Sequence, residues 1–198
     1  MKTRIALAAF TLSITLTAGC SMIHGSPKDP AKNPHPVKRY EVIATSHAPG
    51  PWDSIEGYIG YDVVNRKCLP MDAFLGQQDV PNIGVVIEMT RVDEHTWKGD
   101  FYRDALQDED YYKLGVCHWD VTSASITAIA KGARFNWSHT LSTLLRDGLQ
   151  TSYFKKSAYG DPAAVRSGAQ TLTAEDPDVT QHPDAYFPVT IVVKDVVP

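Results

Sequence analysis

The sequence lacks the features that would place it in several large classes of protein. Its 198 residues carry 19 Lys and Arg against 23 Asp and Glu, a formal net charge of −4, which argues against a nucleic-acid-binding surface. Three cysteines are too few for a small scaffold built on disulfides. The apolar run at residues 5–16 is shorter than the roughly 20 residues of a transmembrane helix. With 43% hydrophobic residues, the chain predicts one globular domain.

Motifs of common catalytic sites are missing as well. The chain contains neither Gly-x-Ser-x-Gly nor His-Glu-x-x-His, and it has no glycine-rich phosphate loop. His182-Pro183-Asp184 matches the J-domain co-chaperone tripeptide, but its proline-rich surroundings indicate a chance match. A pair of carboxylates, as in glycoside hydrolases, leaves no fixed spacing in a sequence and stays open. We therefore expect a protein that is not an enzyme, with no catalytic residues, no cofactor and no bound metal.

Alternating apolar and polar residues predict a mainly β domain. The expected strands cover residues 39–45, 55–64, 83–92, 96–102, 114–130, 134–141 and 188–197. Residues 83–102 are expected to form one hairpin. The alternation slips near residues 122–125, which indicates either a bulge or two strands that meet at a corner. Short helices are expected at residues 71–77 and 140–147, the second ended by Gly148. The expected fold is an antiparallel β-sandwich with one or two short helices and one disulfide.

Two cysteines inside this domain, Cys68 and Cys117, are the candidates for that disulfide. An even pair in an oxidising compartment is typical of a disulfide, and closing a loop of about 50 residues would stabilise the fold by about 4 kcal/mol. Cys117 lies beside His118 and Asp120, so a metal site or a reactive thiol remains as the alternative. The Cys117-x-Trp119 spacing also resembles that of immunoglobulin-like domains, which makes this form of sandwich one to consider.

The negative charge is concentrated in one part of the chain. Residues 68–117 contain four basic and ten acidic residues, and the acids between 100 and 112 are interleaved with aromatic residues. This combination is typical of fast and specific protein recognition, because the charges steer the encounter and the rings supply buried area. A merely solvated loop or a calcium site on the acids at 108–110 is the alternative. The residues expected to bind a protein partner are Asp100, Tyr102, Asp104, Asp108, Glu109, Asp110, Tyr111 and Tyr112.

A second surface is expected from the irregular segment 153–186. It has little periodicity and contains Pro162, Pro177 and Pro183. A segment of this length inside a compact domain is usually functional or mobile. For residues 159–187 the sequence favours neither a functional loop nor a dispensable insertion.

The N-terminus resembles the signal peptide of a bacterial lipoprotein. Two basic residues precede the apolar run, which leads through Ala18 and Gly19 to Cys20. This resembles the lipobox, although Thr17 stands where an aliphatic residue is usual. The resemblance implies cleavage before Cys20 and acylation of that residue, with palmitate among the chains. Ser21 in the next position implies delivery to the periplasmic face of the outer membrane in a Gram-negative bacterium.

These features divide the chain into three parts. Residues 1–19 are the expected signal peptide, residues 20–37 the acylated cysteine and a proline-rich tether, and residues 38–198 a single β-rich periplasmic domain. An extended tether of this length would hold the domain about 50 Å from its lipid. Two or more acyl chains give stable membrane anchoring, whereas one chain gives only marginal binding.

The lipobox, the tether, the cysteine pair and the terminal strand after Phe187 together resemble small periplasmic lipoproteins encoded beside secreted antibacterial effectors. Such proteins are the immunity factors of type VI and related secretion systems. The resemblance implies that the chain binds and inhibits a secreted toxin, for example a lipase or phospholipase; it assigns no role to any single residue. The first alternative is a structural or assembly lipoprotein of an envelope secretion complex. The second is a cell-envelope hydrolase, which would need two carboxylates or a Ser–His pair in a deep pocket.

Overall fold

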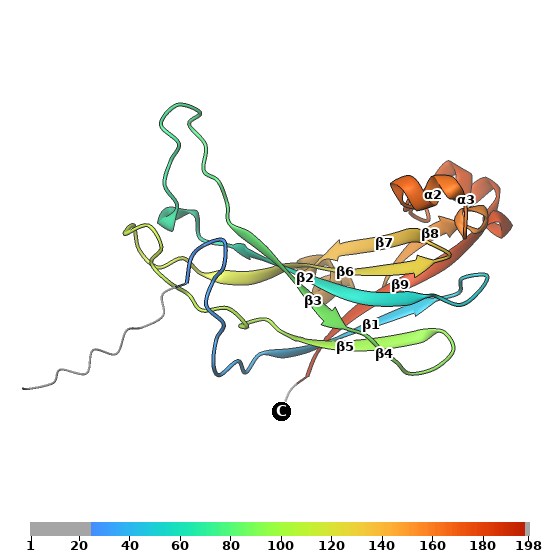
Figure 1. Ribbon diagram of the computed structural model, residues 1–198, viewed down its shortest axis with the longest axis horizontal. Helices are drawn as coiled ribbons and strands as arrows, with labels where there is room; N and C mark the ends of the chain where they lie inside the picture. Colours follow the sequence, from blue (N-terminus) through green and yellow to red (C-terminus); the bar gives the residue numbers. More distant parts are fainter. Residues whose placement is uncertain (1–24, 197–198) are drawn as a thin grey trace, which may run out of the picture.

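Two antiparallel sheets face each other in the computed structural model, which describes residues 25–196 (Figure 1). One sheet has the strand order β4-β5-β1-β9-β8, and the other has the order β3-β2-β6-β7. The strands are β1 (Arg39–Ser46), β2 (Ser54–Val63), β3 (Asn82–Glu88), β4 (Thr90–Arg91), β5 (Thr96–Tyr102), β6 (Trp119–Ala130), β7 (Ala133–Thr140), β8 (Gln150–Lys155) and β9 (Tyr186–Asp195). The prediction of a mainly β fold with two antiparallel sheets is confirmed.

The helices are short and lie between strands. They are α1 (Leu141–Asp147), α2 (Pro162–Ser167) and α3 (Pro177–Gln181), with single 3-10 turns η1 (Arg66–Cys68), η2 (Lys156–Ala158) and η3 (Pro183–Ala185). Helix α1 confirms the prediction for residues 140–147: the Thr140 side chain accepts a hydrogen bond from the Thr143 N–H, and Gly148 ends the helix with a φ of 74°. The helix predicted at residues 71–77 is wrong, because that segment forms a turn. Within residues 25–196, no helix is long and apolar enough to cross a membrane.

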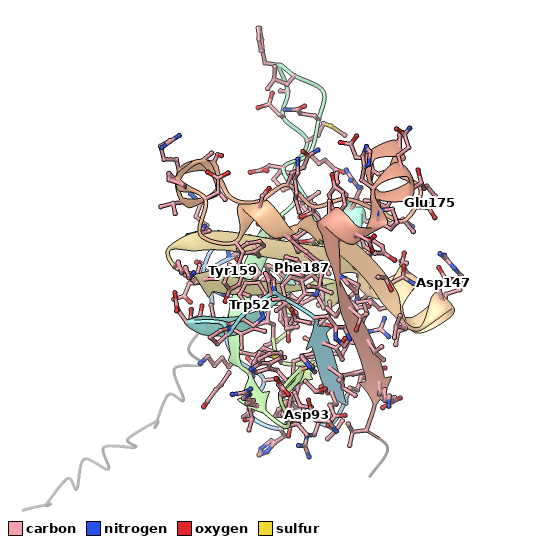
Figure 2. All side chains as sticks on the ribbon, turned by 90° about the vertical axis from the view of Figure 1, so that its right-hand side faces the viewer. Trp52, Asp93, Asp147, Tyr159, Glu175 and Phe187 are labelled. Carbon is pink, nitrogen blue, oxygen red and sulfur yellow. A yellow bond between two sulfur atoms is a disulfide. The ribbon has the colours of Figure 1, made fainter. Side chains whose placement is uncertain are left out.

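The core lies between the two sheets and follows the period of two in the sequence. Every second residue of β1 is buried, beginning with Tyr40, because successive side chains of a strand point to opposite faces. An aromatic cluster joins three buried rings of the core, Phe135, Phe154 and Phe187, to the half-buried rings of Trp52 and Tyr159. Figure 2 shows Trp52, Tyr159 and Phe187 together between the sheets, while the labelled acidic residues lie at the outside.

The expected hairpin at residues 83–102 is divided between the two sheets. Strand β3 pairs with β2 in the four-stranded sheet, whereas β4 and β5 belong to the five-stranded sheet. The chain crosses over at Met89, whose sulfur packs over Gly99 where a Cβ atom would clash with it. Only β4 and β5 therefore form the hairpin, with two residue pairs. The predicted bulge is confirmed, since the β2–β6 register shifts between Gly60 and Tyr61.

The irregular segment that follows β8 covers one edge of each sheet. The Ala169 N–H donates to the Arg134 carbonyl at 2.7 Å, on the edge strand β7. Leu172 exchanges two backbone hydrogen bonds of 2.9 and 3.0 Å with Tyr153, on the edge strand β8. The sequence favoured neither a functional loop nor a dispensable insertion for residues 159–187. In the structure this range includes the residues that cover the edge strands β7 and β8.

Candidate binding surface

Three irregular segments meet at one end of the two sheets (Figure 1). They are the arm (residues 64–81, between β2 and β3), the acidic loop (residues 103–118, between β5 and β6) and the N-terminal segment (residues 25–38). The disulfide between Cys68 and Cys117 joins the arm to the acidic loop, with 5.3 Å between the two Cα atoms and both side chains buried. The predicted disulfide is confirmed. It joins two loops, whereas the disulfide of an immunoglobulin domain joins its two sheets.

Side-chain hydrogen bonds fix the base of the arm in addition to the disulfide. The Asn65 Oδ1 atom accepts from the His118 N–H at 2.6 Å, and Asn65 Nδ2 donates to the Val116 carbonyl at 2.8 Å. On the returning side of the arm, Gln78 Nε2 donates to the carbonyls of Arg66 and Leu69 at 3.0 and 2.8 Å. The base of the arm is therefore attached both to the acidic loop and to itself.

The tip of the arm is an ordered turn built around Asp72. Its Oδ1 atom accepts from the N–H groups of Phe74 and Leu75 at 2.8 and 2.6 Å. Gly76, with a φ of 64°, closes the turn, and its N–H donates to the Asp72 carbonyl at 2.9 Å. This turn points three large apolar side chains into solvent, because Phe74 is 95% exposed, Leu75 61% and Met71 60%. Figure 1 shows the arm standing out from the rest of the molecule.

Most of the acidic residues predicted to contact a partner hold the acidic loop in place. The two carboxylate oxygens of Asp104 accept from the N–H groups of Val37 and Lys38 at 3.1 and 2.9 Å. Those of Asp108 bind the Trp119 N–H at 2.9 Å and lie 2.7 Å from His118 Nδ1.

The remaining predicted contact residues lie in different surroundings. Glu109 accepts from the Gly25 N–H at 3.0 and 3.2 Å, and Asp110 accepts from the Leu114 N–H at 3.1 Å. The Tyr111 hydroxyl accepts from Trp119 Nε1 at 2.9 Å, and Tyr112 is half-buried beside it. Asp100 and Tyr102 lie on β5 outside the acidic loop; Asp100 forms an exposed ion pair of 2.8 Å with Arg39.

The N-terminal segment, predicted as part of the tether, is attached to the acidic loop. Asn33 donates two hydrogen bonds to this loop, from its backbone N–H to the Ala105 carbonyl and from its side-chain amide to the Asp104 carbonyl, both at 2.8 Å. Lys32 forms an isolated β-bridge with Leu106. Cys20, the predicted site of acylation, lies outside the described residues. Because Gly25 is held by Glu109, only residues 21–24 separate Cys20 from the body of the protein.

Several ionisable groups in and beside this region have shifted pKa values, among them Asp104 and Tyr61. Burial alone would raise the pKa of Asp104, but the hydrogen bonds from the Val37 and Lys38 N–H groups outweigh it and lower the pKa below its ordinary value. Burial raises the pKa of Tyr61 to about 12, and its hydroxyl donates to the Tyr102 carbonyl at 2.6 Å. Both groups keep their usual charge at neutral pH, which favours a structural role for them.

A pocket lies at the opposite end of the sheets. Its volume is about 740 Å³, and Trp52, Met89 and Trp97 are among the residues that line it. Glu56 and Glu88 also border it, but the pleat of their strands places both residues on the outer face of the sheet, away from the core. The volume would suit a small ligand. Within residues 25–196, no group of three His, Cys, Asp or Glu side chains is arranged to hold a metal ion.

One Ser–His pair occurs, as the hydrolase alternative would require. Ser152 Oγ lies 3.4 Å from His139 Nε2, and burial lowers the pKa of His139. Ser152 is only 4% exposed, and in the described part of the chain no carboxylate is hydrogen-bonded to His139. Ser152 also precedes Lys155 by three residues, a spacing found in some serine hydrolases. On strand β8, however, this spacing turns the two side chains to opposite faces.

Comparison with known proteins provides no relative. No family model, no curated protein and no solved structure matches the chain. The most distinctive surface therefore has to be interpreted from its own geometry. Sequence reasoning missed its main feature, the exposed Phe74. The available signal was Asp72 ahead of Phe74 and Gly76, since Asp and Gly are turn residues rather than helix formers.

Proposed function

We propose that this chain is a lipid-anchored periplasmic binding protein that captures a secreted antibacterial toxin, with the arm as its leading contact. The observation that carries the proposal is the ordered apolar tip of the arm, where Phe74 is 95% exposed. Aromatic side chains that enter a pocket of the partner contribute most of the binding energy in many complexes. A soluble domain gains nothing for its own stability from a fully exposed Phe.

The bracing of the arm supports a role in binding rather than in flexible linkage. The disulfide fixes its base, and the Asp72 carboxylate fixes its tip. A contact surface that is ordered before binding loses less conformational entropy on association, so more of its contact energy appears as affinity. A projecting arm also fits a concave site on the partner, such as the cleft of an enzyme, which it would block.

The short connection to the lipid anchor supports action close to the membrane. If Cys20 is acylated, the five residue steps to Gly25 span at most about 18 Å. The surface that carries the arm would then lie near the bilayer, much closer than the roughly 50 Å that a free tether would allow. A toxin that attacks lipids would meet the arm at the place where it acts.

The test uses the product of the gene next to this one as the binding partner. The mature chain with Cys20→Ser, which prevents acylation, should bind that purified product in calorimetry. The double variant Phe74→Ala/Leu75→Ala should weaken binding by at least about 30-fold, because it removes about 2 kcal/mol or more of contact energy. The control Leu149→Ala, at a position that is 58% exposed and outside the arm, should bind as the parent does.

Three results would count against the proposal. If cells that lack this gene are no more sensitive to the product of the neighbouring gene, the protein has no role in immunity. Equal affinity of the parent and of the Phe74→Ala/Leu75→Ala variant would move the contact away from the arm. Binding of the Cys20→Ser chain to vesicles of phosphatidylethanolamine and phosphatidylglycerol, lost in the same double variant, would make the arm a membrane contact instead.

A further inference from the structure

One edge of the four-stranded sheet has no cover. Along residues 25–196, β2 is the only strand that is hydrogen-bonded to the seven-residue strand β3. The edge strands on the other side of the molecule, β7 and β8, are both hydrogen-bonded to residues 169–172. The remaining edge strand, β4, has only two residues. The outer edge of β3 is therefore a row of seven residues that pairs with no further strand in the described part of the chain.

The side chains of β3 are mostly apolar but incompletely buried, as in a strand that pairs with a further strand. Ile83 and Val85 point toward the core on the same face as Ile87, yet only Ile87 is buried and the other two are half-buried. On the outer face, Val86 is 61% exposed. Natural proteins protect an open edge with charges, a proline or a bulge. The interior of β3, residues 83–87, contains no charged residue and no proline, and its regular pairing with β2 has no bulge.

The sequence of β3 complements itself in the antiparallel direction. If Val85 is placed opposite Val85 of a second copy, Ile83 faces Ile87, so that the inward side of both strands stays apolar. On the outer face, Val86 faces Gly84, over which the Tyr58 ring of the same chain lies, so the two apolar groups that meet there are Val86 and Tyr58. At the ends Glu88 faces Asn82, so no two like charges are opposed.

We propose that the protein forms a two-fold symmetric dimer in which β3 pairs with β3 of a second copy, with Val85 at the symmetry axis. The two four-stranded sheets then form one continuous antiparallel sheet of eight strands. The pairing satisfies the backbone groups of both edges and covers Ile83 and Val85. An interface of this kind uses the same surface on both subunits and closes on itself, which prevents further edge-to-edge growth. It is independent of the arm and of the proposed toxin.

The pairing predicts a charge-swap experiment on the mature chain with Cys20→Ser. The parent should sediment with twice the monomer mass at tens of micromolar protein. Val85→Lys and Val85→Glu should each raise the dissociation constant of the dimer at least about tenfold, because each places two like charges directly opposite. An equimolar mixture of the two variants should recover the dimer, since opposite charges then meet at the axis.

The matched control is Val92→Lys, at a residue that is 55% exposed beside the β4–β5 turn, which should leave the dimer unchanged. Circular dichroism checks that each Val85 variant keeps its β structure. The Val86→Cys variant offers an independent readout of the edge, because a spin label at Val86 should report a second label within about 20 Å only in the dimer. A parent that sediments as a monomer overturns the proposal. Dimeric Val85→Lys, or a mixture that does not recover the dimer, excludes this pairing of β3.

Discussion

Removing the disulfide should destabilise the protein and should do so mainly at the end that carries the arm. Cys68 and Cys117 are 49 residues apart in the chain, and the chain-entropy relation gives about 4 kcal/mol for a loop of this length. Neither cysteine lies in a strand, so the double variant Cys68→Ala/Cys117→Ala leaves the strand pairing of both sheets intact. The hydrogen bonds of Asn65 and Gln78 remain and should keep part of the arm's base in place.

The assay combines urea unfolding with hydrogen exchange. Unfolding should show a loss of about 3–4 kcal/mol in the free energy of unfolding. Hydrogen exchange should become faster in the arm and the acidic loop through local opening. The exchange rates of amides at the centre of β1 and β9 should rise only as much as the loss in the global free energy of unfolding requires. A loss below about 1 kcal/mol, or equal acceleration of exchange at every amide, would refute the view that this bond organises one end of the molecule.

Three further variants test individual side chains. Asp104→Ala should cost about 1 kcal/mol, because it removes the acceptor of the Val37 and Lys38 N–H groups, which solvent can then reach, and urea unfolding measures this cost. Since the pKa of Asp104 is lowered in the folded protein, the stabilisation by its carboxylate is complete above the unfolded value of about 3.9 and is lost as the pH falls through the folded pKa. The free energy of unfolding of the Asp104→Ala variant should therefore fall less at acid pH than that of the parent. Phe74→Ala should change the free energy of unfolding by less than about 0.5 kcal/mol, since the side chain is 95% exposed, and a larger change in thermal denaturation would mean that the arm packs against the body. Phe135→Ala should cost about 3–5 kcal/mol in urea unfolding because it empties the centre of the aromatic cluster, and a loss below 1 kcal/mol would contradict that packing.

The strands could be predicted where one face of the strand is buried and the other is exposed to solvent. Residues 39–45, 55–64 and 134–141 alternate in this way, and each corresponds to an observed strand. Strand β8 was missed because its buried residues, Ser152 and Phe154, include a polar one, so the alternation of apolar residues is weak. The division at Met89 was also hidden, since both halves of the apolar run 83–92 keep the same period while they enter different sheets.

The candidate site shows the same limit more clearly. The acidic and aromatic residues between 100 and 112 are evident in the composition, but a sequence does not tell whether a carboxylate faces solvent or accepts a backbone hydrogen bond. Asp104, Asp108 and Glu109 bind N–H groups of distant residues, and their proposed contact with a partner stays a prediction. Phe74 and Leu75 were taken for part of a helix because their spacing also fits one. Only the position of the turn at the end of a long arm exposes them.

By itself, the sequence determined the mainly β class, most strand positions, the α1 helix with its glycine end and the pair of cysteines that form the disulfide. These features depend on local periodicity, on backbone preferences of single residues and on the number of cysteines, all of which can be read along the chain. Tertiary structure decided the order of the strands, which edge stays open and which polar groups are already satisfied. These features depend on contacts between residues far apart in the sequence, such as Gly25 with Glu109 or Arg134 with Ala169, and no local pattern encodes them.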